Sequence, residues 1–262
     1  MTSDTESISV VILCGGMGIR MGHEQPKMLT EVGDRPILWH VMKIYASQGF
    51  TRFILALGYR GEDIKRYFLE YGPLTHDFTL TLNTAPAIKY HASHPDEGWH
   101  ITFADTGLHT QTGARIRKVA PYIKSDTFFA TYGDGVANID LAALLAFHRR
   151  MGRIATLTGV HSFSRFGVVQ TNGQGLITGF QEKPLVDALI NGGFFVFEQE
   201  VLDYLEGGDD VILEKEPLKR LADEGQLAIY EHTGFWRAMD TFKDAREMNA
   251  LWRESAPWRI WK

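Results

Sequence analysis

Two aspartates stand where carboxylates could hold a metal ion. Asp134 directly follows the apolar run Thr127–Tyr132, between Gly133 and Gly135, and Asp240 precedes the last amphipathic segment. Two monodentate carboxylates, completed by phosphate oxygens and water, form a normal Mg2+ shell. A turn aspartate at Asp134 and a helix N-cap at Asp240 are the alternatives, because both are common uses of Asp.

A glycine-rich loop, Gly15–Gly18, follows the apolar run Ser9–Cys14. Open α/β sheets bind ligands at the carboxyl ends of their strands, and glycines allow a phosphate to approach backbone N–H groups because no Cβ intervenes. Arg20 and Lys27 follow the loop, which suits a ligand with several negative charges. A simple strand-to-loop turn with two solvated cations is the alternative.

The loop departs from two familiar nucleotide-binding motifs. A P-loop requires Gly-Lys followed by Ser or Thr, whereas Gly18 is followed by Ile19 and Arg20. A dinucleotide-binding loop requires Gly-x-Gly-x-x-Gly, and the third glycine position is Met21 here. The sequence therefore favours another kind of phosphate site.

The elements that would position these residues alternate between short apolar runs and amphipathic segments of helix length through the first 160 residues. This rhythm is typical of an α/β, doubly wound, mainly parallel sheet with helices on both faces. We predict strands at Ser9–Cys14, Arg52–Gly58, Phe78–Leu82, Ile101–Ala104, Thr127–Tyr132 and Ile154–Val160, and helices at Pro36–Gln48, Glu62–Tyr71, Ala114–Ile123 and Asp140–Met151.

After residue 160 the rhythm changes to short strands separated by turn signals. Such a pattern predicts a small antiparallel lobe, followed by a helix, a strand and a last helix. The expected elements are strands at Phe166–Thr171, Leu176–Gln181, Gly193–Phe197 and Leu227–Glu231, and helices at Ile212–Glu224 and Thr241–Trp252. The segment Ala85–Gly98 is expected to be a surface loop or a subunit contact, and the aromatic tail with Trp252, Trp258 and Trp261 should pack on the body or on another subunit.

Composition narrows the classes of function. The chain has 262 residues and a net charge of −5, so a long nucleic-acid partner is not expected. Cys14 is the single cysteine, which excludes an intrachain disulfide and a cysteine zinc site and predicts a buried, inert thiol. Residues 1–7 lack the features of a signal peptide, and no apolar run approaches the roughly 20 residues that cross a bilayer. We therefore expect a cytoplasmic protein without a membrane partner.

Several motifs occur in an order that matches one known family over essentially the whole chain. They are Gly15–Arg20 with Lys27, Pro36–His40, Thr131–Val136, Phe180–Pro184, Ile190–Val196, Gly234–Trp236, Met239–Thr241 and Ala256–Trp258. This combination resembles the sugar nucleotidyltransferases, and within them the glucose-1-phosphate cytidylyltransferase branch. The chain departs from the usual pattern at Ile19, Gln25, Met28 and Ala114, where the family commonly has Thr, Lys, Pro and Gly.

The resemblance implies a Rossmann-like nucleotidyltransferase fold and Mg2+-dependent transfer of a cytidylyl group from CTP to glucose 1-phosphate, giving CDP-glucose and pyrophosphate. It implies one domain over residues 1–262, with a nucleotide-binding core at 7–160 and a sugar-binding lobe with the C-terminal helix at 161–262. Relatives form oligomers, so a homo-oligomer is expected by analogy. A pathway to a surface polysaccharide is also implied.

The site residues divide by task when the family pattern is carried over. Catalytic roles are expected for Arg20, Lys27 and Asp134, and the metal would bind Asp134 and Asp240. The nucleotide side would comprise Cys14, Gly15, Gly16, Met17, Gly18, Arg20, Thr112, Gly113, Arg115 and Gly133. The side that binds the sugar phosphate would comprise Glu182, Lys183, Asn191, Gly192, Tyr132 and Trp236.

Alternatives remain open at this level. The same reaction could use another sugar 1-phosphate, or UTP or dTTP. A glycosyltransferase that uses nucleotide sugars would normally offer Asp-x-Asp for its metal, whereas the chain has Asp134, Gly135 and Val136. A non-catalytic nucleotide-binding regulator would not need to keep the metal pair together with Arg20 and Lys27.

Overall fold

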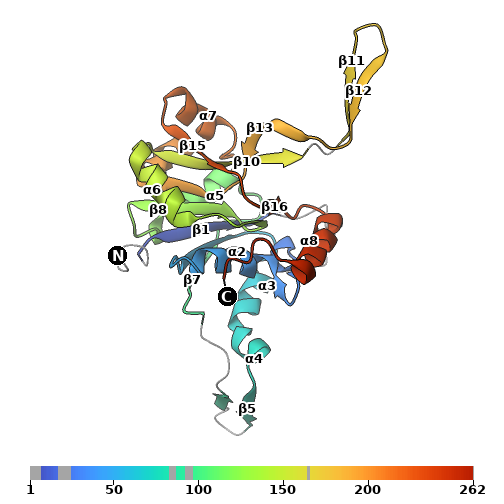
Figure 1. Cartoon of the computed structure of the whole chain (residues 1–262). Coiled ribbons are helices and arrows are strands. Elements are labelled where there is room, and N and C mark those ends of the chain that lie inside the picture. The colour runs from blue at the N-terminus through green and yellow to red at the C-terminus, as the bar shows by residue number, and fades with distance from the viewer. Residues whose placement is uncertain (1–6, 17–24, 83–86, 92–96, 164–165, 262) are drawn as a thin grey trace.

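Four adjacent parallel strands, from β8 to the edge strand β7, form one side of an eight-stranded mixed sheet (Figure 1). The computed structural model describes residues 7–16, 25–82, 87–91, 97–163 and 166–261. In the sheet the strands follow the order β13-β10-β14-β8-β1-β4-β7, and β15 pairs with β10. Their bounds are β1 Ser9–Cys14, β4 Arg52–Leu57, β7 His100–Asp105, β8 Thr127–Tyr132, β10 Ala155–Phe163, β13 Leu185–Asn191, β14 Phe195–Glu198 and β15 Leu227–His232.

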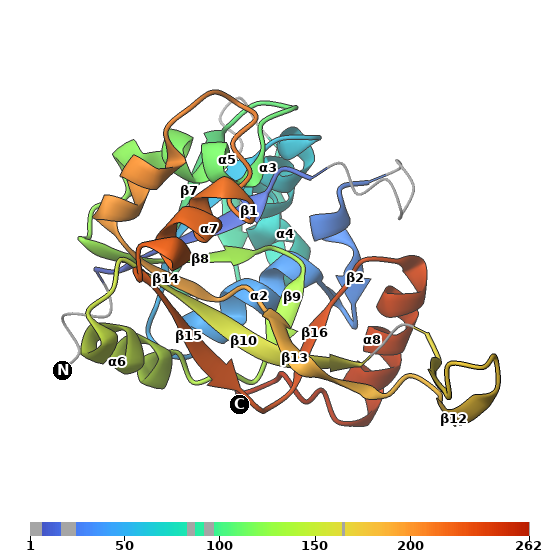
Figure 2. The same cartoon turned by 90° about the horizontal axis from the view of Figure 1, so that it is seen from above.

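The central strand β1 supplies two separate cores, one on each face of the sheet. All its residues are buried, and successive side chains of a strand point to opposite faces. Val10 and Ile12 pack with α2 (Ile37–Ala46), α3 (Gly61–Leu69), α6 (Leu141–Met151) and α8 (Phe242–Glu254), whereas Val11 and Leu13 pack with α5 (Thr112–Val119), η4 (Gln199–Leu205) and α7 (Glu216–Asp223). Figure 2 shows α5 and α2 on opposite sides of the strands. The predicted doubly wound α/β fold is confirmed.

Capping side chains set the starts of two predicted helices. The Asp140 carboxylate accepts a hydrogen bond from the Ala143 N–H at the start of α6, at 2.8 Å. Thr241 and Asp244 form a reciprocal capping box at the start of α8. None of the helices in the described part of the chain is long and apolar enough to span a bilayer.

Short elements complete the described chain. They are the pairs β2 (Glu31–Val32) with β3 (Arg35–Pro36), β5 (Phe78–Thr81) with β6 (Ala87–Tyr90), β9 (Gly135–Ala137) with β16 (Trp236–Ala238) and β11 (Val168–Thr171) with β12 (Ile177–Gln181), together with α4 (Tyr71–Thr75), η2 (Lys27–Leu29) and η3 (Ala120–Tyr122). Of these antiparallel pairs, β11–β12 lies where the small antiparallel lobe was predicted, after residue 160. In Figure 1 the β11–β12 hairpin stands away from the body.

Some boundaries and elements differ from the sequence prediction. The expected loop Ala85–Gly98 contains β6, because its apolar residues pair with β5. Strand β13 was not predicted, since its sequence mixes apolar residues with Asp187 and Asn191, and its partner β10 decides its conformation. The helix expected at Ile212–Glu224 begins only at Glu216, because Pro217 lacks an N–H and is tolerated in the first turn alone.

The C-terminal tail packs on the body of its own chain. This is one of the two alternatives predicted from the sequence, the other being a contact with another subunit. Trp258 is fully buried, and Trp252 and Trp261 pack against the same core. His40 of α2 lies among these rings, with its own side chain fully buried. The tail therefore completes the apolar core that α2 also lines.

The partners of His40 require a neutral imidazole. The carbonyl of Val32 can only accept, so Nε2 of His40 donates to it at 2.8 Å. The indole N–H of Trp258 can only donate, so Nδ1 of His40 accepts from it at 3.4 Å. Burial lowers the pKa of His40 to about 4, which agrees with this arrangement.

We predict a pH-dependent contribution of His40 to stability. The folded-state pKa lies below the unfolded value of about 6.5, so the contribution is complete above that pH and is lost as the pH falls toward 4. The full effect is about 3 kcal/mol. Urea unfolding of wild type and His40→Gln between pH 4.5 and 7.5 checks it, because Gln retains a donor and an acceptor without titrating. Equal pH slopes for the two proteins would contradict the assignment.

Candidate active site

A cavity of about 610 Å³ opens at the carboxyl ends of β1 and β8. This is the edge at which an open α/β sheet binds its ligands. Residues predicted from distant parts of the sequence line it together: Gly15, Gly16, Lys27, Thr112, Arg115, Tyr132, Asp134 and Asp240. The structure therefore brings the nucleotide-side glycines, the expected metal carboxylates and one expected sugar-side aromatic residue to one place.

Lys27 binds both aspartates that the sequence identified as metal ligands. Its ammonium lies 2.5 Å from Oδ2 of Asp134 and 2.9 Å from Oδ1 of Asp240. Only 10% of the Lys27 side chain is exposed, so solvent screens these ion pairs weakly. Burial by itself would lower the pKa of Lys27, but the two carboxylates outweigh it and raise the pKa above its usual value. Lys27 is thus held as an ammonium ion.

Strand pairing brings the two carboxylates together although they are far apart in the sequence. β9 follows Asp134, and β16 precedes Asp240; these short strands pair antiparallel, with Gly135 opposite Ala238. The N–H of Met239 also donates to the carbonyl of Asp134 at 2.9 Å. Thr241, not Asp240, is the N-cap of α8, so the N-cap alternative for Asp240 is wrong.

The carboxylate pair fits a hard divalent cation. Asp134 and Asp240 direct oxygens at one common point, where the Lys27 ammonium balances their charge, and carboxylate oxygen is the ligand type that Mg2+ prefers. Within the described residues no group of three or more His, Cys, Asp or Glu side chains is placed to share a metal ion. A metal held here would therefore need further ligands from outside the protein.

Gly15 and Gly16, the two glycines of the loop that the structure describes, differ in their surroundings. A Cβ on Gly15 would lie 2.0 Å from the guanidinium carbon of Arg115, so protein packing already excludes a side chain at this position. A Cβ on Gly16 would meet no atom of the described residues within 4 Å. Gly16 is therefore the glycine that leaves open space in the cavity. Met17, Gly18 and Arg20 lie outside the described residues.

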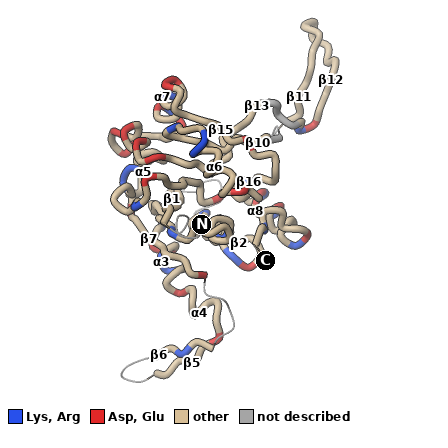
Figure 3. The backbone as a smooth tube through the Cα atoms, turned by 60° about the vertical axis from the view of Figure 1, so that its left-hand side comes forward, with Lys and Arg blue, Asp and Glu red and all other residues tan. Residues whose placement is uncertain are grey.

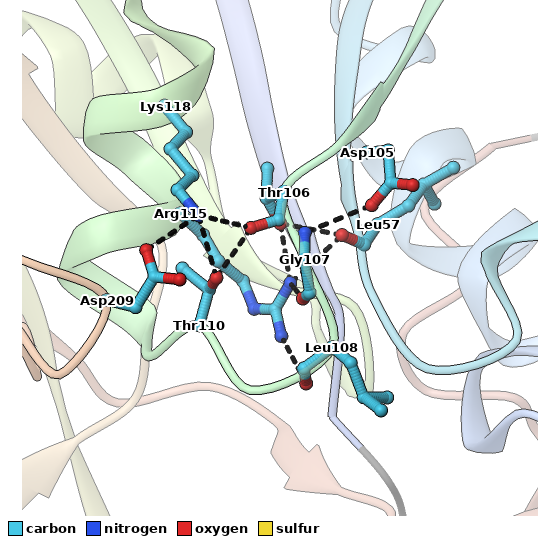
Figure 4. A network of polar contacts seen from close by, with 9 residues as sticks. All are labelled: Leu57, Asp105, Thr106, Gly107, Leu108, Thr110, Arg115, Lys118 and Asp209. Carbon is cyan, nitrogen blue, oxygen red and sulfur yellow. Dashed lines mark hydrogen bonds and ion pairs between the residues drawn. The ribbon is translucent and has the colours of Figure 1, made fainter.

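Arg115 connects the backbone segments that form one side of the cavity (Figure 4). Its guanidinium is almost completely buried and donates hydrogen bonds to the carbonyls of Leu57, Gly107, Leu108 and Gly15 and to the hydroxyl of Thr106. Desolvation lowers the pKa of Arg115, although its charge remains. These contacts join the loops after β1, β4 and β7. A direct role of Arg115 in binding a nucleotide stays a prediction.

Three more residues expected on the nucleotide side are buried near the same edge. Cys14 is 1% exposed, and burial raises the pKa of its thiol, which confirms the predicted buried and inert thiol. A Cβ on Gly133 would lie 2.5 Å from the sulfur of Met28. Gly113 lies in the first turn of α5 against Val211. Contacts of these residues with a ligand stay predictions.

Four residues expected to bind the sugar are joined in hydrogen-bonded pairs, here called the sugar wall, and of the four Tyr132 lines the cavity whereas Asn191, Gly192 and Trp236 do not. The phenol oxygen of Tyr132 accepts from the Asn191 amide at 3.1 Å, and the indole N–H of Trp236 donates to the Gly192 carbonyl at 2.7 Å. Burial, together with the nearby charge of Glu214, raises the pKa of the Tyr132 phenol, which therefore stays protonated. The wall joins strand β8 to the end of β13.

Glu182 and Lys183 stand apart from this wall. They follow β12, at the base of the β11–β12 hairpin, and their side chains are 63% and 52% exposed with 3.6 Å between the charged atoms. Neither lines the cavity within the described chain. Lys183 has a left-handed backbone, with φ of 46°, directly before Pro184. The structure thus leaves their predicted contact with the sugar phosphate as a prediction.

Sequence reasoning missed Glu214, whose carboxylate binds both Thr112 and Tyr132, and Asp210, which lines the cavity. Glu214 lies inside the helix predicted at Ile212–Glu224, directly before the charged residues Lys215 and Glu216. No local signal separates Glu214 from its neighbours. Its partners lie 102 and 82 residues away in the sequence, so only the fold reveals them.

Comparison with known proteins places the chain in a family. The sequence model of the nucleotidyl transferase family matches residues 9–255. The chain is 45% identical to a probable glucose-1-phosphate cytidylyltransferase of Bacillus subtilis over 97% of this chain and all of that protein, and 42% identical to the glucose-1-phosphate cytidylyltransferase of Salmonella typhimurium over the same shares.

A solved structure agrees in fold. HddC from Yersinia pseudotuberculosis superimposes with a TM-score of 0.69 at 18% identity, over 93% of this chain and 98% of that one. With the full-length matches in sequence, the conclusion is direct. The chain belongs to the nucleotidyl transferase family and, within it, to the glucose-1-phosphate cytidylyltransferases.

Proposed function

We propose that this protein transfers the cytidylyl group of CTP to glucose 1-phosphate, giving CDP-glucose and pyrophosphate. The observation that carries the proposal is the convergence of Lys27, Asp134 and Asp240 in the cavity at the strand ends. The names of the relatives supply the substrates. The family assignment removes the support for a glycosyltransferase or a non-catalytic regulator.

The chemistry requires positioning and charge neutralisation more than proton transfer. An oxygen of the sugar phosphate attacks the α-phosphorus of the triphosphate in line, and pyrophosphate leaves. The second pKa of a phosphate monoester is about 6, so the nucleophile is mostly ionised at neutral pH and no general base is needed. The main difficulty is to bring two polyanions together, which calls for fixed cations and a rigid site.

The residues of the cavity match these requirements. Asp134 and Asp240 would hold Mg2+, which supplies positive charge for the phosphate oxygens when it is bound. Lys27 contributes an ammonium at the same place and can neutralise a phosphate oxygen there. Arg20 is proposed to act on the triphosphate with Lys27. Arg115 holds the carbonyl of Gly15 in place at the edge of the cavity.

The two parts of the chain would divide the substrates. Residues 7–160 would bind the nucleotide, with Gly16 offering open backbone in the cavity and Thr112 beginning α5, whose N-terminus favours anions. Residues 161–262 would bind the sugar phosphate through Asn191, Gly192 and Trp236. Lys183 and Glu182 are proposed to join them from the base of the hairpin.

We predict that Asp134→Asn and Asp240→Asn each reduce turnover at least about a hundredfold, because each removes one carboxylate charge from the metal pair. Mg2+-dependent release of pyrophosphate from CTP and glucose 1-phosphate measures the effect, and removal of the metal with EDTA should abolish release by wild type. Asp223→Asn at the exposed end of α7 is the matched control. Near-normal activity of Asp134→Asn would refute the metal role.

We predict a preference for CTP with glucose 1-phosphate in a substrate panel. CTP, UTP, dTTP and GTP are each paired with glucose, mannose and galactose 1-phosphates, and kcat/KM is read from pyrophosphate release. At least about tenfold discrimination is expected, which corresponds to a transition-state difference of about 1.4 kcal/mol. Turnover of another pair with none of this one would overturn the substrate assignment while leaving the reaction class intact.

We also propose that the protein is a homo-oligomer whose contacts include the β11–β12 hairpin. An isolated two-stranded hairpin is marginally stable in water, and this one carries Leu176, Ile177 and Phe180 at 62–66% exposure. Residues 166–181 contain no charged side chain, and the hairpin is therefore tan in Figure 3, where only Lys, Arg, Asp and Glu are blue or red. The aromatic tail, which the sequence analysis gave as another possible subunit contact, packs on the body of its own chain instead, with Trp258 fully buried.

Light scattering after size exclusion tests the oligomer. Wild type should exceed the mass of one 29.6 kDa chain, and the double substitution of Leu176 and Phe180 by Ser should reduce the mass because it removes apolar area from the contact. Tyr122→Ser removes an exposed aromatic residue elsewhere and should leave the mass unchanged. A monomeric wild type at micromolar concentration would contradict the proposal.

A further inference from the structure

The carboxylate of Glu214 connects two walls of the cavity. One oxygen accepts a hydrogen bond from the hydroxyl of Thr112 at 2.6 Å, and the other accepts from the phenol of Tyr132 at 2.5 Å. Thr112 is the first residue of α5, on the proposed nucleotide side. Tyr132 ends β8, two residues before Asp134. Glu214 itself lies in neither element but in the segment before α7.

The proton positions of this network follow from its chemistry. A carboxylate can only accept, so both hydroxyls must donate to Glu214. The oxygen of Thr112 is then free to accept from the N–H of Leu213, at 3.0 Å, and the oxygen of Tyr132 to accept from the Asn191 amide. The network therefore has one consistent arrangement of donors and acceptors, with Glu214 as the acceptor at its centre.

The chain of contacts continues to the backbone of the proposed sugar side. The amide oxygen of Asn191 accepts from the Gly193 N–H at 3.0 Å, which fixes the orientation of the amide. Gly193 has φ of 76°, and a Cβ there would lie 3.0 Å from the Tyr132 ring. The Asn191 amide is thus held at its oxygen by Gly193 and at its nitrogen by the Tyr132 phenol, whose own proton is directed at Glu214.

Glu214 does not line the cavity, whereas Thr112 and Tyr132 do. An additional negative charge would oppose the binding of two polyanions, so direct contact with phosphate does not account for a carboxylate here. A role in orienting hydroxyl groups does explain a carboxylate at this position. A carboxylate is ionised at neutral pH, is then the strongest hydrogen-bond acceptor among side chains, and can accept from two donors at once.

We propose that Glu214 is a positioning residue, which sets the distance between the nucleotide wall at Thr112 and the sugar wall at Tyr132 and Asn191. This inference rests on the proposed function, because it assigns substrates to the two walls. Glu214 acts through the residues that it orients, and it fixes the rotamers of Tyr132 and Asn191 before the sugar phosphate arrives. Its removal should therefore weaken binding of the sugar phosphate more than it slows the chemical step.

The test is a set of steady-state measurements on Glu214→Ala, Glu214→Gln and the control Glu216→Ala. Glu214→Ala should raise KM for glucose 1-phosphate about tenfold with a smaller change in kcat, since two hydrogen bonds to a charged group are lost. Glu214→Gln, which keeps the size and one acceptor oxygen, should recover part of this loss. Glu216→Ala, two residues on and also exposed, should match wild type.

A double-mutant cycle separates positioning from general destabilisation. In the Thr112→Ala, Tyr132→Phe background both hydroxyls are absent, so Glu214→Ala should cause less than about a twofold further change in kcat/KM. Thermal unfolding of each variant shows whether the fold is retained. Additive effects in the cycle, or an unchanged KM in a folded Glu214→Ala variant, would overturn the positioning role.

Wild type assayed in parallel distinguishes failure of this inference from failure of the proposed function. Normal wild-type turnover with an unchanged Glu214→Ala variant refutes the role of Glu214 alone. If wild type turns over a different nucleotide and sugar phosphate, the same cycle is read with that pair. Absence of turnover with every pair in the panel refutes the proposed function, and the inference with it.

Discussion

A single buried guanidinium organises the edge of the sheet on which the site depends. Arg115 extends from α5 to the ends of β1, β4 and β7, and its guanidinium donates hydrogen bonds to the carbonyl groups of Leu57, Gly107 and Gly15 there. Its position leaves no room for a side chain on Gly15 or Gly58, where a Cβ would lie within 2.6 Å of guanidinium atoms. The glycine after β1 is therefore required first by the protein itself.

Next to the segments that Arg115 connects, the charge of the Lys27 ammonium offsets part of the charge of Asp134 and Asp240. Asp134 and Asp240 are two carboxylates close together, a repulsive arrangement unless a cation lies between them. The Lys27 ammonium meets that need, and strand pairing of β9 with β16 sustains the close approach. A site of this kind suits polyanionic substrates, since each phosphate meets cations and backbone that are already in place and reorganisation is small.

The two halves of the cavity share the apolar cores on both faces of the sheet, and polar contacts connect them at the edge where the cavity lies. There Glu214, Thr112, Tyr132 and Asn191 join the start of α5 to the ends of β8 and β13. Hydrogen bonds have strict geometry, so these contacts control the orientation of the walls closely. The hairpin β11–β12, with Glu182 and Lys183 at its base, stands away from the body of the chain.

The sequence alone determined the fold class and the central strands, because all-apolar runs such as Ser9–Cys14 are local signals that predict buried strands. It singled out Asp134 and Asp240 as a carboxylate pair through the resemblance to the family, and their role as metal ligands stays a prediction. Only the tertiary structure decided that Lys27 lies between the carboxylates, that Arg115 supports the loop at Gly15, and that Glu214 joins Thr112 to Tyr132. Each of these contacts joins residues about 80 to 210 positions apart, and no periodicity or spacing in the sequence encodes such pairings. They arise because the sheet brings the ends of its strands to one edge, where side chains compete for the same donors and acceptors.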